Sequence, residues 1–389
     1  MIELLQPEIQ QFIDDHLDDQ PADLMLRASQ YPGWPMKDIV NQIVARKKAQ
    51  LKLPDWFGQK GLIWPAVISM EQCSSQRTAT YKSSLISGKS MTDLTGGFGV
   101  DTYYLSRQFS EVTHVEMNEE LHQVVSHNFG VLKANINTVR NTAEKYLQEM
   151  KEVDLVYIDP ARRDDQEQKV IFLDDYSPNV IELLPLLLEK AKTVMIKASP
   201  MLDIKKAIND LKHVEEVHVV ALNNEVKELL FLLRKELTGE TKVKAVNLAT
   251  HTSILEFLYS EEDKVNINYS SAQTYIYEPN LAILKAGAFK SVVKRFNLNK
   301  LHPNSHLYTS DRFVSEFPGR SFKLMDVLPL NKKKLRSQFN SDQANITVRN
   351  YPMSVQAIRQ KTGLKDGGKH YILATTDMES RKLLLCEKV

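Results

Sequence analysis

A glycine-rich turn carries the first candidate chemistry of the chain. In Asp93-Leu94-Thr95-Gly96-Gly97-Phe98-Gly99 an acidic residue stands near the end of an expected strand, and a helix is expected from Asp101. Glycines at such a turn let the backbone approach a ligand closely, because a Cβ would obstruct it. We therefore expect a bound nucleoside here, contacted by Asp93, Thr95, Gly97 and Gly99.

The spacing of this turn argues against a dinucleotide. A dinucleotide site uses Gly-x-Gly-x-x-Gly and places the phosphates at a helix N-terminus. That triplet spacing is missing here, and Asp101 at the expected helix start would repel a pyrophosphate. S-adenosylmethionine has no phosphate and carries a sulfonium and an ammonium group. An acidic rim suits it, with Asp93 facing its amino-acid end.

Polar residues also follow the next two expected strands. Glu116 ends the second strand, 23 residues after Asp93, and a carboxylate there can accept hydrogen bonds from both ribose hydroxyls. Asn141 and Ala143 follow the third strand, where a small polar group would read the adenine edge. Each acid alone is as readily a helix cap or a solvated carboxylate. Suitable residues after three consecutive strands favour the cofactor.

A second polar segment, Asp159-Pro160-Ala161-Arg162-Arg163, ends the fourth expected strand beside the cofactor crevice. Asp159 is the catalytic candidate, since it can accept a proton or hydrogen bond from an attacking nitrogen, and it is also a cofactor candidate. Arg162 and Arg163 have forked donors for a phosphate or carboxylate of the substrate, or for an ion pair with a neighbouring helix. Lys197, at the end of the fifth strand, is another substrate-side candidate.

These residues require a framework that brings strand ends together, and the sequence predicts one. Between about 85 and 235, short strands alternate with helices, which is typical of a parallel, doubly wound α/β sheet. The expected strands are Ser90–Leu94, Val112–Glu116, Ile136–Arg140, Leu155–Asp159, Val194–Lys197 and Val217–Leu222, and the expected helices are Asp101–Phe109, Glu119–Lys133, Ala143–Met150, Pro178–Ala191 and Leu202–Leu211.

The last two strands of this region predict a tight hairpin. Val217–Leu222 and Val226–Leu233 are separated by Asn223-Asn224, residues typical of a two-residue turn. The hairpin makes the final strand antiparallel within a mostly parallel sheet of seven strands. That arrangement separates the Rossmann-like core of a class I methyltransferase from an ordinary dinucleotide-binding fold.

The regions on either side of the core differ from it. Residues 1–70 predict a helical cap over Pro7–His16, Ala22–Ser29 and Met36–Ala49, and three tryptophans, Trp34, Trp56 and Trp64, are expected to anchor its core. After about 240, strands are expected over Val243–Leu248 and Val265–Tyr269, and Asn280–Phe289 opens a small helical or mixed region. Residues 322–389 predict an α+β unit with strands Asn345–Arg349, Tyr371–Thr375 and Lys382–Glu387 and a helix over Ser354–Thr362.

Composition limits the class of protein. The chain has 389 residues, of which 42% are hydrophobic and 25% charged, enough for two or three globular domains. It contains no run of 18 apolar residues and no signal-peptide pattern at its start. Only two cysteines, Cys73 and Cys386, are present, which argues against a disulfide framework or a cysteine-rich metal site. We expect a cytoplasmic protein that binds neither metal nor membrane.

The net charge of +1 hides an asymmetry. Residues 321–389 hold 13 Lys and Arg against 6 Asp and Glu, and the preceding residues are mildly acidic. This pattern is typical of a nucleic-acid-binding appendage, although a solvated lysine-rich surface explains it equally well on charge alone. The residues expected to line an RNA groove are Lys332, Lys333, Lys334, Arg336, Arg349, Arg359, Lys361, Lys365 and Lys369, with Tyr351 and Tyr371 for base stacking.

With these segments in view, residues 71–235 resemble a class I S-adenosylmethionine-dependent methyltransferase. Nearly the whole chain is similar to the bacterial methyltransferase family that carries a C-terminal THUMP-like domain preceded by a small ferredoxin-like module. The resemblance rests on Glu71-Gln72-Cys73-Ser74-Ser75, Thr78-Ala79-x-Tyr81-Lys82, Asp93–Asp101, Asp159–Arg163, Lys197–Pro200, Asn345-x-Thr347-Val348-Arg349-Asn350 and Leu364–Gly368.

The resemblance implies a division into a cap (1–70), a methyltransferase core (71–240), connecting strands with the ferredoxin-like module (241–321) and the THUMP-like domain (322–389). It also implies cofactor contacts at Asp93, Gly97, Gly99 and Glu116, a substrate-side role for Asp159, and binding of tRNA or rRNA by the last domain, where Arg349 is a candidate contact.

Two departures from the family pattern limit this comparison. Thr95 stands where the first glycine is usual, which a backbone with negative φ tolerates. Asp159-Pro160-Ala161-Arg162 is not the Asp/Asn-Pro-Pro-Tyr/Phe tetrad of base-amino methyltransferases, in which the aromatic ring stacks on the extruded base. Specificity for an exocyclic amine is therefore not carried over.

The sequence favours an S-adenosylmethionine-dependent RNA methyltransferase and leaves two alternatives open. One is a methyltransferase for a protein or small molecule, and the other is an RNA-binding protein with a catalytically silent core. The RNA species, the methylated atom and the oligomeric state are not determined by the sequence.

Overall fold

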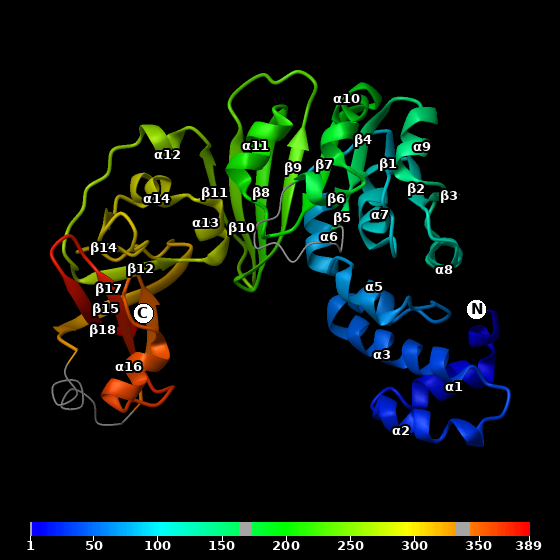
Figure 1. Ribbon diagram of the computed structural model, residues 1–389, viewed down its shortest axis with the longest axis horizontal. Coiled ribbons are helices and arrows are strands. Elements are labelled where there is room, and N and C mark those ends of the chain that lie inside the picture. The colour runs from blue at the N-terminus through cyan, green and yellow to red at the C-terminus, as the bar shows by residue number, and fades with distance from the viewer. Residues whose placement is uncertain (1, 163–172, 331–342) are drawn as a thin grey trace. The chain divides into compact units, whose positions relative to one another are not determined.

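The computed structural model describes residues 2–162, 173–330 and 343–389 (Figure 1). Arg163 and the basic residues Lys332, Lys333, Lys334 and Arg336 lie outside these ranges. The chain forms two compact units. The first comprises Met1–Glu216 with Glu228–Gly239, and the second comprises Val217–Lys227 with Glu240–Val389.

A nine-stranded sheet with the order β11-β10-β8-β9-β7-β4-β1-β2-β3 forms the core. Its strands are β1 (Ser90–Asp93), β2 (Glu111–Glu116), β3 (Asn137–Arg140), β4 (Val153–Ile158), β7 (Ala191–Ala198), β8 (Val214–Leu222), β9 (Glu225–Leu233), β10 (Lys242–Leu248) and β11 (Ser253–Leu258). The pairs from β3 to β7 are all parallel, and β9 runs antiparallel to β7. The predicted mostly parallel sheet of seven strands with one antiparallel strand is confirmed, and β10 and β11 extend it.

The hairpin between β8 and β9 has the predicted tight turn. Asn223 and Asn224 have φ of 50° and 64°, the left-handed values that a type I′ turn needs at both central positions. Asparagine tolerates this conformation better than most residues with a side chain. The two residues that identify the hairpin in the sequence therefore also determine its geometry.

Helices lie between successive parallel strands, as the alternation in the sequence predicts (Figure 1). They are α7 (Val100–Leu105), α8 (Glu119–Val131), α9 (Ala143–Glu149), α10 (Val180–Lys190) and α11 (Ile204–Leu211). Four of them begin at a residue whose side chain accepts a hydrogen bond from the first turn: Asn118, Thr142, Asn179 and Asp203. Such caps satisfy otherwise unpaired backbone N–H groups.

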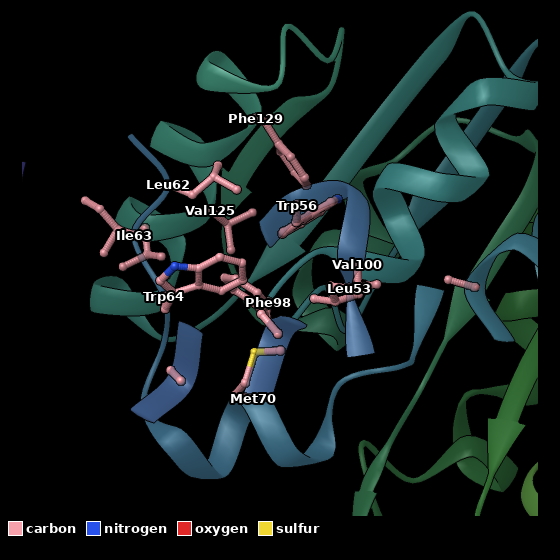
Figure 2. Packing of buried hydrophobic residues seen from close by; sticks show 14 of the residues in the cluster. Leu53, Trp56, Leu62, Ile63, Trp64, Met70, Phe98, Val100, Val125 and Phe129 are labelled. Carbon is pink, nitrogen blue, oxygen red and sulfur yellow. The ribbon is translucent and has the colours of Figure 1, made fainter. Parts of the chain in front are cut away.

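The N-terminal region is helical, as predicted. It contains α1 (Pro7–Asp15), α2 (Pro21–Leu26), α3 (Met36–Lys52), α4 (Pro54–Phe57), α5 (Val67–Gln72) and α6 (Gln76–Ser83). Trp56 and Trp64 are buried, and their rings lie 5.2 and 6.1 Å from the ring of Phe98 in the core (Figure 2). Trp34 is only half-buried and packs edgewise on Phe12. The helical region thus shares a hydrophobic cluster with the core.

The second unit contains a seven-stranded sheet with the order β13-β14-β12-β15-β18-β17-β16. Its elements are β12 (Tyr275–Pro279), β13 (Asn299–Lys300), β14 (Tyr308–Ser310), β15 (Gly319–Leu328), β16 (Asn345–Arg349), β17 (His370–Thr376) and β18 (Arg381–Lys388), with helices α12 (Glu261–Lys264), α13 (Leu281–Ala286), α14 (Phe289–Phe296) and α16 (Val355–Thr362). β15 pairs with β12 on one side and β18 on the other. One sheet therefore joins strands from both small C-terminal modules.

One expected strand, Val265–Tyr269, is wrong. Only Tyr269 forms an isolated bridge, with Lys300, and the antiparallel partner of β10 is the earlier segment β11. None of residues 265–269 is buried. A segment without a buried face has nothing to fix its pairing register, so its alternating pattern does not suffice to make a strand.

Within the ranges that the structure describes, no helix combines the length and apolar character needed to span a bilayer.

Candidate active site

The candidate residues of the first unit meet at one edge of the core sheet. In a parallel sheet the carboxyl ends of the strands lie along the same edge, and ligands bind in the crevice outside them. Asp93 pairs in register with His114 on β2 and Tyr157 on β4, and Glu116 is the last residue of β2. Asp159 directly follows β4, and Lys197 lies one residue before the end of β7.

The glycine turn has the backbone that the sequence pattern predicts. Gly97 and Gly99 have φ of 55° and 77°, and a Cβ built on Gly97 meets only the Thr95 carbonyl oxygen, at 3.9 Å. The space beside Gly97 is therefore open to a ligand. Gly97 N–H donates to Glu116 Oε2 (2.9 Å), and Asn118 N–H donates to Oε1 (2.7 Å). Glu116 is thus held against the turn and keeps further lone pairs on both oxygens.

Gly99 is constrained on two counts, which gives a testable expectation. A Cβ there would lie 2.6 Å from the Phe129 ring and would impose a side chain on a left-handed φ. Gly99→Ala should lower the free energy of unfolding by about 2–4 kcal/mol, measured by urea denaturation. Gly130→Ala is the matched control, because it adds a methyl group with no neighbour within 4 Å in helix α8 and should leave stability unchanged or raise it slightly. Equal effects in the two variants would contradict this account.

Asp93 is buried and fixed by neighbouring groups. Its Oδ1 accepts from Thr95 N–H (3.0 Å), and its Oδ2 accepts from the Thr102 hydroxyl (2.6 Å). Burial raises the pKa of Asp93 to about 7, against these two hydrogen bonds, and the nearby carboxylates of Asp101 and Asp159 raise it further. A group with this pKa changes charge near neutral pH, so its ionisation responds to a cationic ligand.

His114 supports the turn from behind and was missed by sequence reasoning. Its Nδ1 lies 2.9 Å from the Thr102 hydroxyl, and a Cβ on Gly96 would lie 2.0 Å from the imidazole. Burial lowers the pKa of His114 to about 3, so the ring is neutral. Gly96 is therefore required by this ring. No spacing rule marks Thr102 or His114, because their contacts link a helix to the strand beside it.

Thr95 and Lys197 determine how Asp159 is held. Asp159 N–H donates to the Thr95 hydroxyl (2.6 Å), which ties the glycine turn to the end of β4. The Lys197 ammonium forms an ion pair with Asp159 Oδ2. Burial lowers the pKa of Lys197, but the carboxylates of Asp159 and Asp101 outweigh it and hold that pKa above its usual value. Asp159 remains 35% exposed, so its other oxygen is available to a substrate.

The residues after β3 are less distinctive. Asn141 Oδ1 accepts from Thr142 N–H (2.9 Å), and Ala143 is buried as the first residue of α9.

Met117, which directly follows Glu116 and is 70% exposed, provides a further apolar surface at the site. The thioether side chain of Met117 suits contact with an aromatic face. Nothing in the sequence spacing distinguished Met117 from a surface residue.

The structure describes the proposed arginine contacts only in part. Arg162 pairs through its backbone with Tyr176, in the two-stranded ladder of β5 (Ala161–Arg162) and β6 (Tyr176–Ser177). Its side chain, like the whole of Arg163, lies outside the described part of the chain. Arg349 belongs to the second unit, where its guanidinium lies 2.7 Å from the buried carboxylate of Glu278.

The assembled site offers two carboxylates, an open glycine turn and an ion-paired aspartate. Asp93 and Glu116 suit an ammonium group and a pair of hydroxyls, respectively, and the open space at Gly97 suits close approach of a ligand. These features fit the chemistry of S-adenosylmethionine. Across the described ranges, no group of three or more His, Cys, Asp or Glu side chains is placed to hold a metal ion.

Comparisons with known proteins give matches along most of the chain. A family model described as conserved hypothetical protein 95 matches residues 77–219, one described as a ferredoxin-like domain matches 275–318, and one described as THUMP domain-like matches 319–388. Among curated proteins, no significant match to the chain was found.

One solved structure is similar over almost the entire length. It is described as a "putative methyltransferase from Porphyromonas gingivalis W83", with 36% identical residues, a TM-score of 0.89 and coverage of 98% of both chains. Two others are partial. A "putative RNA methyltransferase" from Pyrococcus horikoshii (17% identity, TM-score 0.31) covers 49% of this chain and 99% of its own, and an "rRNA Methylase" from Streptococcus thermophilus (13%, 0.30) covers 41% and 95%.

Proposed function

The chain belongs to the methyltransferase family with a ferredoxin-like module and a C-terminal THUMP-like domain, and on this basis we propose that it uses S-adenosylmethionine to methylate RNA. The observation that carries the cofactor assignment is the open turn at Gly97 with Asp93 and Glu116 on either side of it. The RNA assignment rests on the THUMP-like match and on the basic charge of the same residues.

The residues that would hold the cofactor have distinct tasks. Asp93 would bind the ammonium group, Glu116 the ribose hydroxyls, and Met117 with Asn141 and Ala143 the adenine. Gly97 and Gly99 keep the backbone close, and Thr95 fixes the turn to the end of β4. When bound, S-adenosylmethionine supplies an activated methyl group on a sulfonium.

At the reaction centre the protein's task is mainly orientation. Methyl transfer needs an in-line approach of the acceptor, which positioned side chains provide. Asp159 would accept a hydrogen bond from the attacking nitrogen through the oxygen that Lys197 does not occupy, and later its proton. Lys197, being paired with Asp159, would orient that carboxylate rather than contact the substrate itself.

The second unit would hold the RNA. Lys361, Lys365 and Lys369 are exposed around the end of α16, and Arg349 is half-exposed on β16. Tyr371 packs against Phe322 at 5.1 Å and Tyr351 against the core of this unit, so both rings have structural partners. The RNA contact is therefore proposed mainly through phosphates.

This proposal predicts a charge-dependent loss of RNA affinity. Replacing Lys361, Lys365 and Lys369 with Gln should weaken binding to total tRNA and lower the log–log slope of affinity against salt by about 2–3, as three phosphate contacts are lost. Exposed lysines of the first unit, Lys37, Lys205 and Lys235, replaced by Gln serve as the control. An unchanged slope in the first variant would exclude this RNA surface. Substitution is preferable to deleting residues 319–389, because β15 shares its sheet with β12.

The function itself is tested by the modified nucleosides of total RNA. Mass spectrometry of RNA from cells with and without the gene should show one methylated nucleoside missing from the deletion strain, restored by the wild-type gene and not by an Asp159→Asn copy. An unchanged nucleoside profile would exclude RNA methylation. Labelled methyl transfer into protein or a small molecule in the same extracts would then support the alternative substrate classes, and absence of cofactor turnover would indicate a silent core.

A further inference from the structure

A series of buried ion pairs runs from Asp159 at the candidate reaction centre, through Lys197 and Asp101, to Lys82 and Glu228. Lys82 on α6 is fully buried, and its ammonium lies 2.6 and 2.7 Å from the two carboxylate oxygens of Glu228 on β9. The same ammonium lies 3.2 Å from Asp101 Oδ1 on α7. Both Lys82 and Glu228 lie outside the set of residues proposed to touch cofactor or substrate.

Asp101 is the carboxylate that contacts both lysines of this series. Its Oδ2 accepts hydrogen bonds from the Ser74 hydroxyl and the Tyr157 hydroxyl, both at 2.7 Å, and Lys197 lies 3.9 Å from it. Burial tends to raise the pKa of Asp101, but Lys82 and Lys197 together with these hydrogen bonds hold it below its usual value. Asp101 is therefore an anion inside the protein, and it can attract Lys197.

The Lys197 ammonium thus lies near two carboxylates, those of Asp159 and Asp101, and is hydrogen-bonded to only one of them. It pairs with Asp159, while its distance to Asp101 exceeds a hydrogen bond. Charges in a weakly polarisable interior interact strongly, so the position of Lys197 depends on how much negative charge Asp101 presents. Lys82 supplies a positive charge to Asp101, and Glu228 with Ser74 fixes Lys82 in place.

We propose that Lys82 and Glu228 are positioning residues for methyl transfer: Glu228 holds the Lys82 ammonium beside Asp101, and Lys82 offsets the charge of Asp101. Lys197 is then left to Asp159, and it orients the carboxylate that meets the substrate. This inference rests on the proposed function for its consequence in turnover, but not for the pairing of Lys197. A buried ion pair is not required for stability, since well-packed apolar residues of similar volume commonly replace one without loss. Stability alone therefore does not explain the buried Lys82–Glu228 ion pair. Its effect on whether Lys197 pairs with Asp101 or with Asp159 does.

The test removes both charges together. Lys82→Met with Glu228→Leu leaves the net charge unchanged and avoids a single buried, unpaired ion. In crystals of this variant, we expect the Lys197 ammonium to move to hydrogen-bonding distance of Asp101 and to leave Asp159. In methyl transfer to RNA from the deletion strain, kcat should fall by about 10-fold, with KM for RNA and the Kd of S-adenosylmethionine within about 2-fold of wild type.

One control variant and one second test variant distinguish a positioning role from a general loss of stability. Glu215→Gln with Arg234→Gln removes an ion pair between β8 and the residue that follows β9, and it should change neither the position of Lys197 nor kcat. Tyr157→Phe removes one donor from Asp101 without a cavity and should shift Lys197 in the same direction, even if the double variant fails to fold. If Lys197 stays on Asp159 in every folded variant, the inference is overturned. If wild type transfers no methyl group to RNA, the proposed function fails while the crystal comparison still decides the pairing.

Discussion

Asp93→Asn should weaken S-adenosylmethionine binding by about 30- to 100-fold while leaving the protein folded. A charge-assisted hydrogen bond between the carboxylate and an ammonium group typically contributes 1.5–3 kcal/mol, and Asn cannot supply the charge. Asn still accepts from Thr95 N–H, and the Thr102 hydroxyl can turn to donate to His114 Nδ1. Isothermal titration calorimetry measures the loss.

The same variant should change the pH dependence of stability. The pKa of Asp93 rises from 3.8 to about 7 on folding, so the native state binds its proton more tightly than the unfolded state does. The contribution of this group to stability is therefore full below about pH 4 and is lost as the pH rises to about 7. Asp93→Asn removes this loss of stability, which is on the order of 4 kcal/mol for this rise in pKa. Binding of the cofactor to wild type should in turn strengthen through pH 7, as the carboxylate ionises.

Asp154→Asn is the matched control for both effects. Asp154 lies on β4 at the opposite edge of the sheet, and a hydrogen bond from Lys192 and the N–H groups of Ser90 and Lys89 hold its pKa at about 2. The contribution of Asp154 to stability is present above about pH 4 and is lost as the pH falls toward 2. This pH dependence is opposite in direction to that of Asp93. Cofactor affinity should not change in this control. Full affinity in Asp93→Asn would refute the assigned role of Asp93.

Asp159→Asn should lower kcat for methyl transfer by about 10²- to 10⁴-fold and leave S-adenosylmethionine affinity within about 3-fold of wild type. Asn keeps the size and the N–H bond to Thr95 but accepts a proton poorly, and Lys197 loses its ionic partner. Single-turnover transfer to RNA from the deletion strain measures the chemical step. Equilibrium binding measures the cofactor separately.

Asp154→Asn is also the control for Asp159→Asn, because Asp154 lies on β4, the strand that Asp159 follows. Asp154→Asn changes a carboxylate of β4 that faces Lys192 rather than Lys197, and it should retain kcat within about 2-fold. An Asp159→Asn enzyme with full turnover would show that the acceptor needs no carboxylate at this position. A parallel loss of cofactor affinity would place Asp159 in cofactor binding rather than in the reaction.

Local features of the site could be predicted from the sequence because they depend on neighbours in the chain. The glycines at 97 and 99 are needed for left-handed φ values, and Asn223-Asn224 fixes a two-residue turn. Alternation of strand and helix then places the residues at the carboxyl ends of β1, β2, β4 and β7 along one edge. These are consequences of short-range conformational preference and of sheet geometry.

The tertiary structure alone decided which partner each charged group has. Asp101 looks in the sequence like an acid on the rim of the site, yet it is buried between Lys82, Ser74 and Tyr157. Arg349 resembles a free substrate contact, yet Glu278 holds it. The modules at the C-terminus likewise read as separate units, although one sheet joins them.

The physical reason is the range of the interactions. A turn or helix cap is set by residues within a few positions, whereas Lys82 and Glu228 lie 146 residues apart and meet only when α6 packs beside β9. Burial then determines which ionised groups must be paired, because an unpaired charge in the interior is costly. The sequence by itself determined which strand ends form the candidate site, and the packed core decided that Lys197 forms an ion pair with Asp159 there.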